Sequence, residues 1–263
     1  MASFTGSSIK DVYKDILHTS NSNTGLSTTI KQITCGDGDA TPLYLGTRNV
    51  KIQPVADSTA NTVIYDADGN ALVTVDSTND LVKVGVGQHT VNTQYAHFGI
   101  GSGDSANAGI VAGRHSAIPF NGYASQTALD GSTGTDPLTA MTVTTTADDL
   151  VGSIWYLCDN ITIDRVIWFA GGDAATGEVV RTHLMSYTID VGNSATGGDL
   201  SSGAVLATSS DVTTAGYEQS YYNQMTIASA DVDANKAIIF WFRPDSTVNS
   251  DYTINATVKY HLR

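Results

Sequence analysis

Residues 252–262 read YTINATVKYHL and carry the clearest structural signal in the chain. Apolar and polar side chains alternate at every step, which is the pattern of a β-strand with one buried face. The residues of the apolar parity are Tyr252, Ile254, Ala256, Val258, Tyr260 and Leu262. The pattern predicts a sheet with its opposite face turned to water or to a partner.

The sequence before this strand is rich in further β signals. Runs of β-branched and aromatic residues, separated by Gly, Asn and Asp turns, continue back to Pro137. The expected strands are 138–145, 151–157, 161–170, 178–190, 204–209, 219–228 and 236–243. With 252–262 they make about eight, the number typical of a sandwich or jelly roll. We therefore expect residues 136–263 to form an antiparallel, jelly-roll-like β-sandwich as a C-terminal head domain.

Residues 26–98 contain shorter strands and more turns. Small hairpins of this kind bury too little surface to be stable alone. We expect this short-stranded β region to trimerise around a three-fold axis. Residues 99–135 are rich in Gly, Ser, Asn and Ala and are expected to be a linker. The strands expected in the first region are 28–34, 49–53, 62–65, 71–75 and 81–86.

The first residues carry a clear helical period. Ser8 is a suitable N-cap with Asp11 three residues later, and stop signals follow in residues 21–25. We expect a short N-terminal helix over residues 9–18, within a helical anchor of residues 1–25. A helix this brief needs a cover for its apolar stripe, supplied by its own domain, a neighbouring subunit or a larger assembly. The stripe, which we expect to be an anchoring or oligomer interface, is Ile9, Val12, Tyr13, Ile16 and Leu17.

The chain is acidic and sparsely charged. It has 13 Lys and Arg against 26 Asp and Glu, a formal net charge of −13, which disfavours binding to nucleic acid. Its 41% hydrophobic content is too high for a disordered acidic chain. The longest apolar runs, 166–170 and 237–242, are too short to cross a bilayer. The first residues lack the pattern of a secretory signal, so we expect synthesis without a signal peptide.

Cysteine and histidine usage points to structural roles. Cys35 and Cys158 lie far apart in the chain, and we expect reduced, buried residues; a single long-range disulfide is the alternative. No two of the six histidines have the i, i+4 spacing of a helical metal site. His183 and His261 lie in expected strands and are predicted to face solvent or a subunit interface.

No motif for catalysis or ion binding is complete. Residues 66–70 and 231–235 begin like calcium loops but lack the later ligands, and turns explain both. Residues 99–103 are glycine-rich without the Lys-Ser/Thr pair of a phosphate loop. Glutamate occurs only at Glu178 and Glu218. We expect no enzyme, metal or cofactor; a partial calcium site and the carboxylate pair of a polysaccharide hydrolase stay as alternatives.

Aromatic residues cluster in the expected head domain. Adjacent aromatics in a strand point to opposite faces, so one of each pair should be buried and the other should reach a second face or a neighbouring chain. An exposed ring would also suit a sugar. The candidates for an interface or for glycan binding are Trp155, Trp168, Tyr221, Tyr222 and Trp241.

Several segments of the chain are distinctive as sequences. Near the N-terminus they are SFTGSSIKDVYKDIL (3–17), TTIKQI (28–33) and GDG (36–38), and later in the chain NDLVKVG (79–85) and VKYHLR (258–263). These segments resemble fibre and surface proteins of tailed bacteriophages, especially those of marine bacteria. The resemblance implies a trimeric virion component with an N-terminal attachment part and an outward-pointing C-terminal β domain. It transfers no catalytic residue.

Pattern and resemblance together predict a homotrimeric short fibre or capsid decoration protein at the virion surface. Its partners would be further copies of itself and capsid or tail proteins contacted through the N-terminal region. The alternative is a tail-fibre-type adhesin that recognises host surface glycans, and a less favoured one is a polysaccharide hydrolase.

Overall fold

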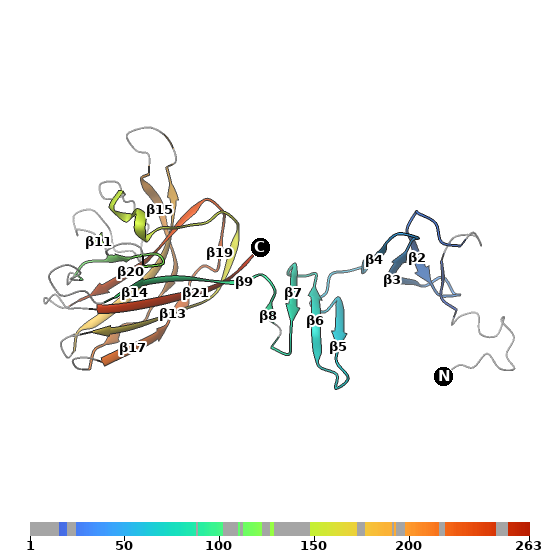
Figure 1. Ribbon diagram of the computed structural model, residues 1–263, viewed down its shortest axis with the longest axis horizontal. Helices are drawn as coiled ribbons and strands as arrows, with labels where there is room; N and C mark the ends of the chain where they lie inside the picture. Colours follow the sequence, from blue (N-terminus) through green and yellow to red (C-terminus); the bar gives the residue numbers. More distant parts are fainter. Residues whose placement is uncertain are drawn as a thin grey trace. The chain divides into compact units, whose positions relative to one another are not determined.

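The computed structural model describes residues 16–19, 25–87, 89–101, 110, 113–122, 127–128, 148–172, 177–190, 192, 198–215, 219–245 and 252–263. The chain divides into two compact units, Met1–Val91 and Asn92–Arg263. Both are built mainly from β-strands (Figure 1), and every pairing between described strands is antiparallel. The predicted mainly β class is therefore confirmed.

The first unit begins with a small sheet. Its strands lie in the order β1 (His18–Thr19), β2 (Lys31–Thr34), β3 (Ala40–Leu45) and β4 (Val50–Ile52). β3 is not among the strands expected from the sequence, because Pro42 lies inside it and proline lowers the signal for a strand. The structure accommodates Pro42 where the β2–β3 register shifts, and its carbonyl accepts a 2.8 Å hydrogen bond from the Gln53 amide.

The second sheet of this unit is a meander. It contains β5 (Thr62–Tyr65), β6 (Ala71–Asp76), β7 (Leu81–Val84) and β8 (His89–Thr90), each paired with the next. The β5–β6 turn forms because the Asp66 carboxylate accepts hydrogen bonds from the amides of Asp68 (2.9 Å) and Asn70 (2.8 Å). Gly69 takes a φ of +85°, which glycine adopts without strain. The predicted strands 62–65 and 71–75 are confirmed within one residue.

The expected N-terminal helix is not seen in the described residues. Residues 9–15 lie outside them, and the end of the expected helix is not helical, since Ile16 and Leu17 lack regular structure and His18 pairs with Thr34 in β1. The physical reason lies in the partner strand. β2 presents an open edge, and its hydrogen bonds compete with the marginal last turn of so short a helix.

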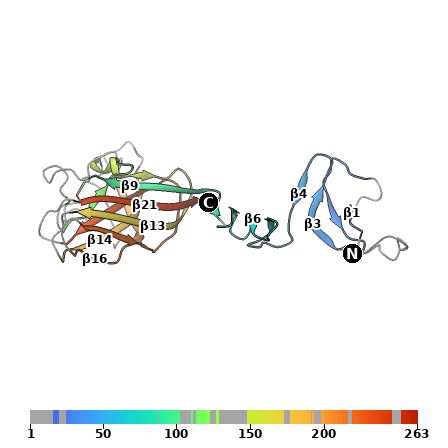
Figure 2. The ribbon, with the colours of Figure 1, turned by 60° about the horizontal axis from the view of Figure 1, so that its bottom comes forward.

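The second unit contains two sheets. The described strands of the larger run in the order β11 (Thr127–Ala128), β10 (Ser116–Ile118), β20 (Lys236–Pro244), β14 (Val179–Ile189), β15 (Leu200–Thr208) and β18 (Thr226–Ile227). Two short strands, β12 (Trp155–Tyr156) and β16 (Val212–Thr213), pair with β20 and β14. The smaller sheet has the order β17 (Gln219–Gln224), β13 (Ile161–Gly172), β21 (Tyr252–Leu262) and β9 (Thr93–Ile100), with β19 (Asp231–Val232) paired to β13. Figure 2 shows β9, β21 and β13 side by side.

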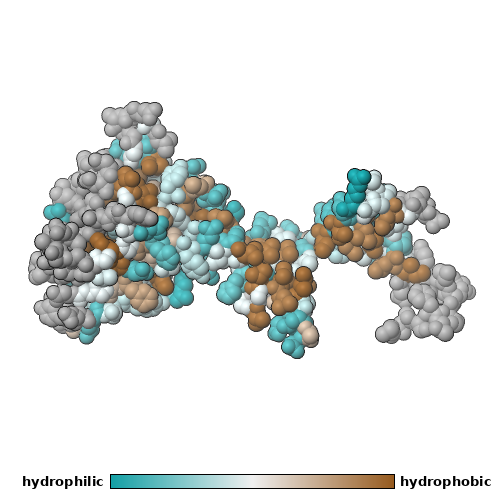
Figure 3. Space-filling view, viewed as in Figure 1, coloured by the Kyte–Doolittle hydropathy of each residue, from teal (hydrophilic) through white to brown (hydrophobic). Residues whose placement is uncertain are grey.

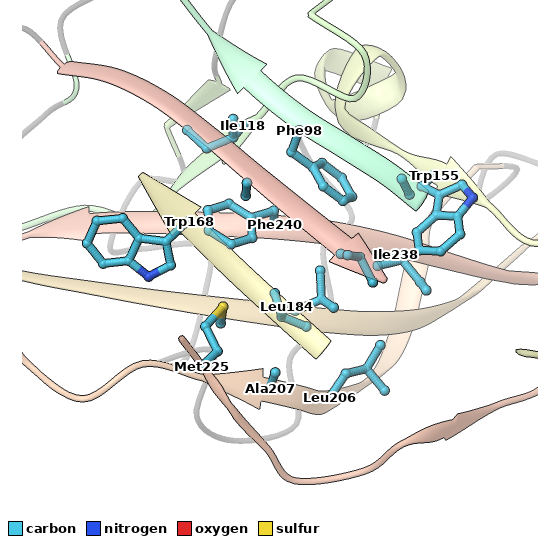
Figure 4. Close-up of a cluster of buried hydrophobic side chains, with 14 of the residues drawn as sticks. Phe98, Ile118, Trp155, Trp168, Leu184, Leu206, Ala207, Met225, Ile238 and Phe240 are labelled. Carbon is cyan, nitrogen blue, oxygen red and sulfur yellow. The ribbon is translucent and has the colours of Figure 1, made fainter. Parts of the chain in front are cut away.

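A cluster of buried side chains joins these two sheets. It includes Phe98 and Trp168 from the smaller sheet and Leu184 and Phe240 from the larger (Figure 4). The apolar parity of β21 contributes to the same cluster, so the alternation predicted for residues 252–262 is confirmed. The sheets pack on each other because each presents one continuous apolar face to the other.

The larger sheet is also buried on its other face. A second cluster contains Tyr187, Ile239 and Trp241, and it is joined by Leu150 from the 3-10 helix η2 (Asp148–Ser153). This two-sided burial explains why β20 reads as the unbroken apolar run AIIFWF instead of alternating. The expected strand over residues 151–157 is replaced by the end of η2 and by β12.

The boundary between the two units differs from the sequence prediction. Residues 92–98 were assigned to the first region and residues 99–135 to a linker, but β9 pairs with β21 along its length and β10 pairs with β20. Phe98, Ile110 and Ile118 are fully buried. Their burial was not predicted, because the segment as a whole is polar in composition. A few apolar residues at suitable positions are nevertheless enough to join a hydrophobic core. The expected strand 138–145 lies outside the described residues.

Candidate interaction surfaces

One face of the β5–β8 meander is apolar and open. The pairs Ile64↔Val73, Val73↔Val84 and Val75↔Val82 lie directly opposite each other across the sheet, so their side chains share one face. We call Ile64, Val73, Val75, Val82 and Val84 the valine face. None of the five is buried, and Ile64 is 56% exposed. Figure 3 shows hydrophobic residues gathered over this sheet.

The opposite face of the meander carries a buried polar network beside Val63, Leu72 and Leu81. The Asp76 carboxylate, itself buried, accepts hydrogen bonds from the Asn79 side chain (2.9 Å) and from Lys83 Nζ (2.9 Å). These two partners, Asn79 first, lower the pKa of Asp76 from 3.8 to about 2. The network pins the β6–β7 register and leaves the valine face as the side without partners.

The rest of the first unit is likewise poor in buried residues. Only Ile33, Thr74 and Asp76 are buried among the described residues of this unit. Val50, Ile52 and Val55 are exposed around the first sheet. Of the predicted anchoring stripe, Leu17 is exposed, Ile16 is partly buried, and Ile9, Val12 and Tyr13 lie outside the described residues.

The aromatic candidates of the second unit have separate locations. Trp155, Trp168 and Trp241 are buried, so their rings cannot meet a glycan, and Tyr221 packs against the core. Trp241 points to the face opposite that of its neighbours Phe240 and Phe242, and it is buried as well because the larger sheet is covered on both faces. Its indole N–H donates a hydrogen bond to the Tyr187 hydroxyl at 2.9 Å. Burial raises the pKa of Tyr187.

Tyr222 is the candidate that is exposed, and it lies beside a ring that the prediction left out. Its ring centroid is 5.1 Å from that of Phe169, its cross-strand neighbour. Phe169 and Tyr222 are 49% and 50% exposed, while the adjacent Trp168 is fully buried. The alternation of neighbouring aromatics in a strand, applied to Trp168 and Phe169, was the available signal for this pair.

A cleft of about 480 Å³ adjoins the same sheet face at its β9 edge. Its lining includes His97, Gly99, Asn121, Thr253 and Asn255. Asn255 lies opposite both Phe169 and Gly99, so cleft and aromatic pair are contiguous. No carboxylate occurs among the described residues that line this cleft, which gives the hydrolase alternative no support there.

The described glutamate is placed away from this cleft. Glu178 is buried, and its Oε2 accepts a 2.6 Å hydrogen bond from the Tyr252 hydroxyl. Burial first, and then the neighbouring Glu178, raises the pKa of Tyr252. Glu218, the second glutamate, lies outside the described residues.

The two calcium-like segments are occupied by internal contacts. Asp66 caps its own hairpin turn, and Asp231 and Asp233 form ion pairs with Arg263 at 3.5 and 3.1 Å. The described part of the chain contains no group of three His, Cys, Asp or Glu residues arranged to hold a metal ion.

The cysteine and histidine predictions are partly corrected. Cys35 and Cys158 are both free, but neither is buried, because both lie in turns that follow strands. The prediction that His183 faces solvent or a subunit interface is wrong, because β14 is covered on both faces and His183 is fully buried opposite Trp241. His261 lies on the outer side of β21 and contacts Asp164 at 2.9 Å.

No protein family model matches this chain, and no curated protein matches it either. None of the helices in the described regions is long and apolar enough to span a membrane.

Proposed function

We propose that this chain is a structural protein of a tailed-phage virion surface, a short fibre or capsid decoration protein in which three copies associate through the first unit. In this proposal the second unit is a jelly-roll-like sandwich that projects as the head. The observation that carries the assembly is the valine face, a set of β-branched residues that stay partly or largely exposed among the described residues.

Energetics favour the covering of this face by copies of the same chain. Complete burial of one valine or isoleucine side chain stabilises a protein by about 1.5–3 kcal/mol. The five residues of the valine face are partly or largely exposed, and few of the described residues of this unit are buried. Three identical faces around a symmetry axis would supply the missing core.

The assembly is tested by the mass of the full chain in solution. Wild-type protein at micromolar concentration is expected to show three times its chain mass of 27.6 kDa by analytical ultracentrifugation. Val82→Glu places a charge on the valine face and should shift the protein to monomer, because a buried unpaired charge is costly.

Leu72→Glu is the matched control for this substitution. Leu72 is 39% exposed and Val82 is 38% exposed, and they lie on opposite faces of the same meander. The control should remain trimeric. A monomeric wild type, or equal loss of trimer in both variants, contradicts assembly through the valine face.

The virion assignment rests on the resemblance of the N-terminal segments to phage surface proteins. In it, residues 1–25 attach the trimer to capsid or tail proteins. Val12→Asp places charge on the predicted stripe and should abolish incorporation into particles, as measured by immunoblotting of purified virions. Lys14→Asp, off the stripe, is the control. Normal incorporation of Val12→Asp would exclude the anchoring role.

A further inference from the structure

The outer face of the smaller sheet carries an ordered row of side chains. Tyr222 lies opposite Phe169, Phe169 opposite Asn255, and Asn255 opposite Gly99. Directly paired residues have their side chains about 5 Å apart on one face. The row thus runs from two aromatic rings through an amide to the glycine that opens the cleft.

The aromatic end of this row is held in place. Arg165 Nη2 donates a hydrogen bond of 3.2 Å to the Tyr222 hydroxyl. The two ring planes meet at 50°, so each ring turns part of its face to solvent. Gly171 follows Phe169 on the same face and has no side chain to cover it. A fixed, half-exposed aromatic pair is a surface suited to the apolar face of a sugar ring.

Two positive charges lie on the same face, four residues along the strands from Phe169 and Asn255, and Arg165 reaches the Tyr222 hydroxyl. Arg165 and Lys259 are directly opposite each other in the β13–β21 pairing. Like charges at such positions destabilise a sheet. Neither cation has an ion-pair partner among the described residues, and Asp164, beside Arg165, is engaged by His261. On a chain with a net charge of −13, this pair marks the face as complementary to an anion.

Besides Ile167, the face carries neutral hydrogen-bonding side chains. His97 Nδ1 and Thr257 Oγ1 lie 3.1 Å apart in the neighbouring row, and Asn255, Asn121 and Thr253 line the cleft. Amide, hydroxyl and imidazole groups match the hydroxyl groups of a saccharide as donors and acceptors. Stacking, hydrogen bonding and anion recognition therefore meet on one face.

We propose that this face binds an acidic polysaccharide. A sugar ring stacks on Phe169 and Tyr222, its carboxylate or sulfate group is held by Arg165 and Lys259, and a neighbouring sugar donates and accepts hydrogen bonds at Asn255 in the cleft. This binding site goes beyond the assembly function and does not depend on it.

The test is affinity gel electrophoresis of the full chain in gels that contain alginate, a linear polyuronate, or dextran, a neutral glucan. Alginate is expected to retard wild-type protein and dextran is not. Phe169→Ala and Tyr222→Ala should each weaken alginate binding at least tenfold. The Arg165→Gln/Lys259→Gln double variant should abolish it.

Matched controls separate the site from general effects. Arg48→Gln/Lys51→Gln removes the same charge from exposed residues of the first unit, and Tyr156→Ala removes an exposed aromatic from the larger sheet. Both are expected to bind alginate like wild type. Sedimentation of every variant records the oligomeric state, so loss of the trimer and loss of binding are distinguished.

Three results would overturn the proposal. They are the absence of binding to alginate and to chondroitin sulfate, equal retardation by dextran, and equal loss of binding in the charge control. A change of oligomer mass in Phe169→Ala without polysaccharide binding in wild type would instead make the face an interface between copies.

Discussion

At the scale of single residues, Asp76 controls the geometry of the first unit. Its carboxylate is the one buried acid described there, and it links the β6–β7 turn through Asn79 to Lys83 across the pairing. Because Asn79 and Lys83 stabilise the ionised form, folding lowers the pKa of Asp76 from 3.8 to about 2.

Asp76→Asn is expected to lower the stability of the meander at pH 7. Because the pKa of Asp76 is lower in the folded than in the unfolded state, its carboxylate contributes its full stabilisation of the folded state above the unfolded pKa near 4. This contribution is lost as the pH falls through the folded pKa of about 2. The difference between variant and wild type should therefore be constant above about pH 5 and shrink as the pH falls from about 4 to below 2. Amide hydrogen exchange in β6 and β7 measures it. Asp57→Asn, at an exposed position, is the control, and a difference as large at pH 2 as at pH 7 contradicts this role of Asp76.

Residue patterns predicted some side-chain positions and failed at others for a physical reason. The alternation of residues 252–262 placed each side chain of β21 correctly, because one face is buried and the other open. His183 and Trp241, by contrast, are buried where we expected a solvent-facing or interface position. Their strands are covered on both faces, and parity carries information only where the two faces differ.

At the scale of elements, β20 is the strand most sensitive to polar substitution. Ile238 faces the cluster between the sheets and Ile239 faces the cluster under η2, and both are fully buried. Ile239→Asn should destabilise the second unit by about 3–5 kcal/mol, from lost burial and an unsatisfied amide, and Ile238→Asn should cost as much. Urea denaturation followed by tryptophan fluorescence measures both.

Ile167→Asn is the comparison for these two variants, because Ile167 lies on the open face of β13 and is partly exposed. It should cost under about 1 kcal/mol, as surface substitutions do. A mild effect of Ile239→Asn with a large effect of Ile238→Asn would refute burial on the outer side of β20.

Elements with strong local patterns were predictable, and elements defined by pairing were not. β5, β6 and β21 combine β-branched residues with clear turns. β1 and β10 are only two and three residues long and exist through their partners β2 and β20. The sequence predicted one residue of the candidate surface, Tyr222. Its proximity to Phe169, Arg165 and Asn255 could not be predicted, because it depends on the register between strands that are distant in the sequence.

At the scale of the whole molecule, the two units differ in self-sufficiency. One cluster lies between the smaller and the larger sheet, and the other lies on the opposite face of the larger sheet. Both consist of residues from 96 to 262, so the second unit contains its own core. The first unit has three buried residues among those described.

Residues 92–263 expressed alone should therefore fold as a monomer with a cooperative thermal transition, measured by calorimetry and sedimentation. Residues 1–91 alone should either trimerise or lack such a transition. A cooperatively folded monomer of residues 1–91 would remove the basis of the assembly proposal, whereas an unfolded 92–263 fragment would show that the second unit relies on the first.

The pairing of β9 with β21 also determines how the second unit responds to force. The chain enters at Asn92, whose side chain donates a hydrogen bond to the Leu262 carbonyl, and the two strands run antiparallel from that point. A pull between Asn92 and Leu262 unzips the ladder one bond at a time. A load between Asn92 and Tyr252, at the far end of β21, shears all its rungs together, so tension applied from that end meets the greater mechanical resistance.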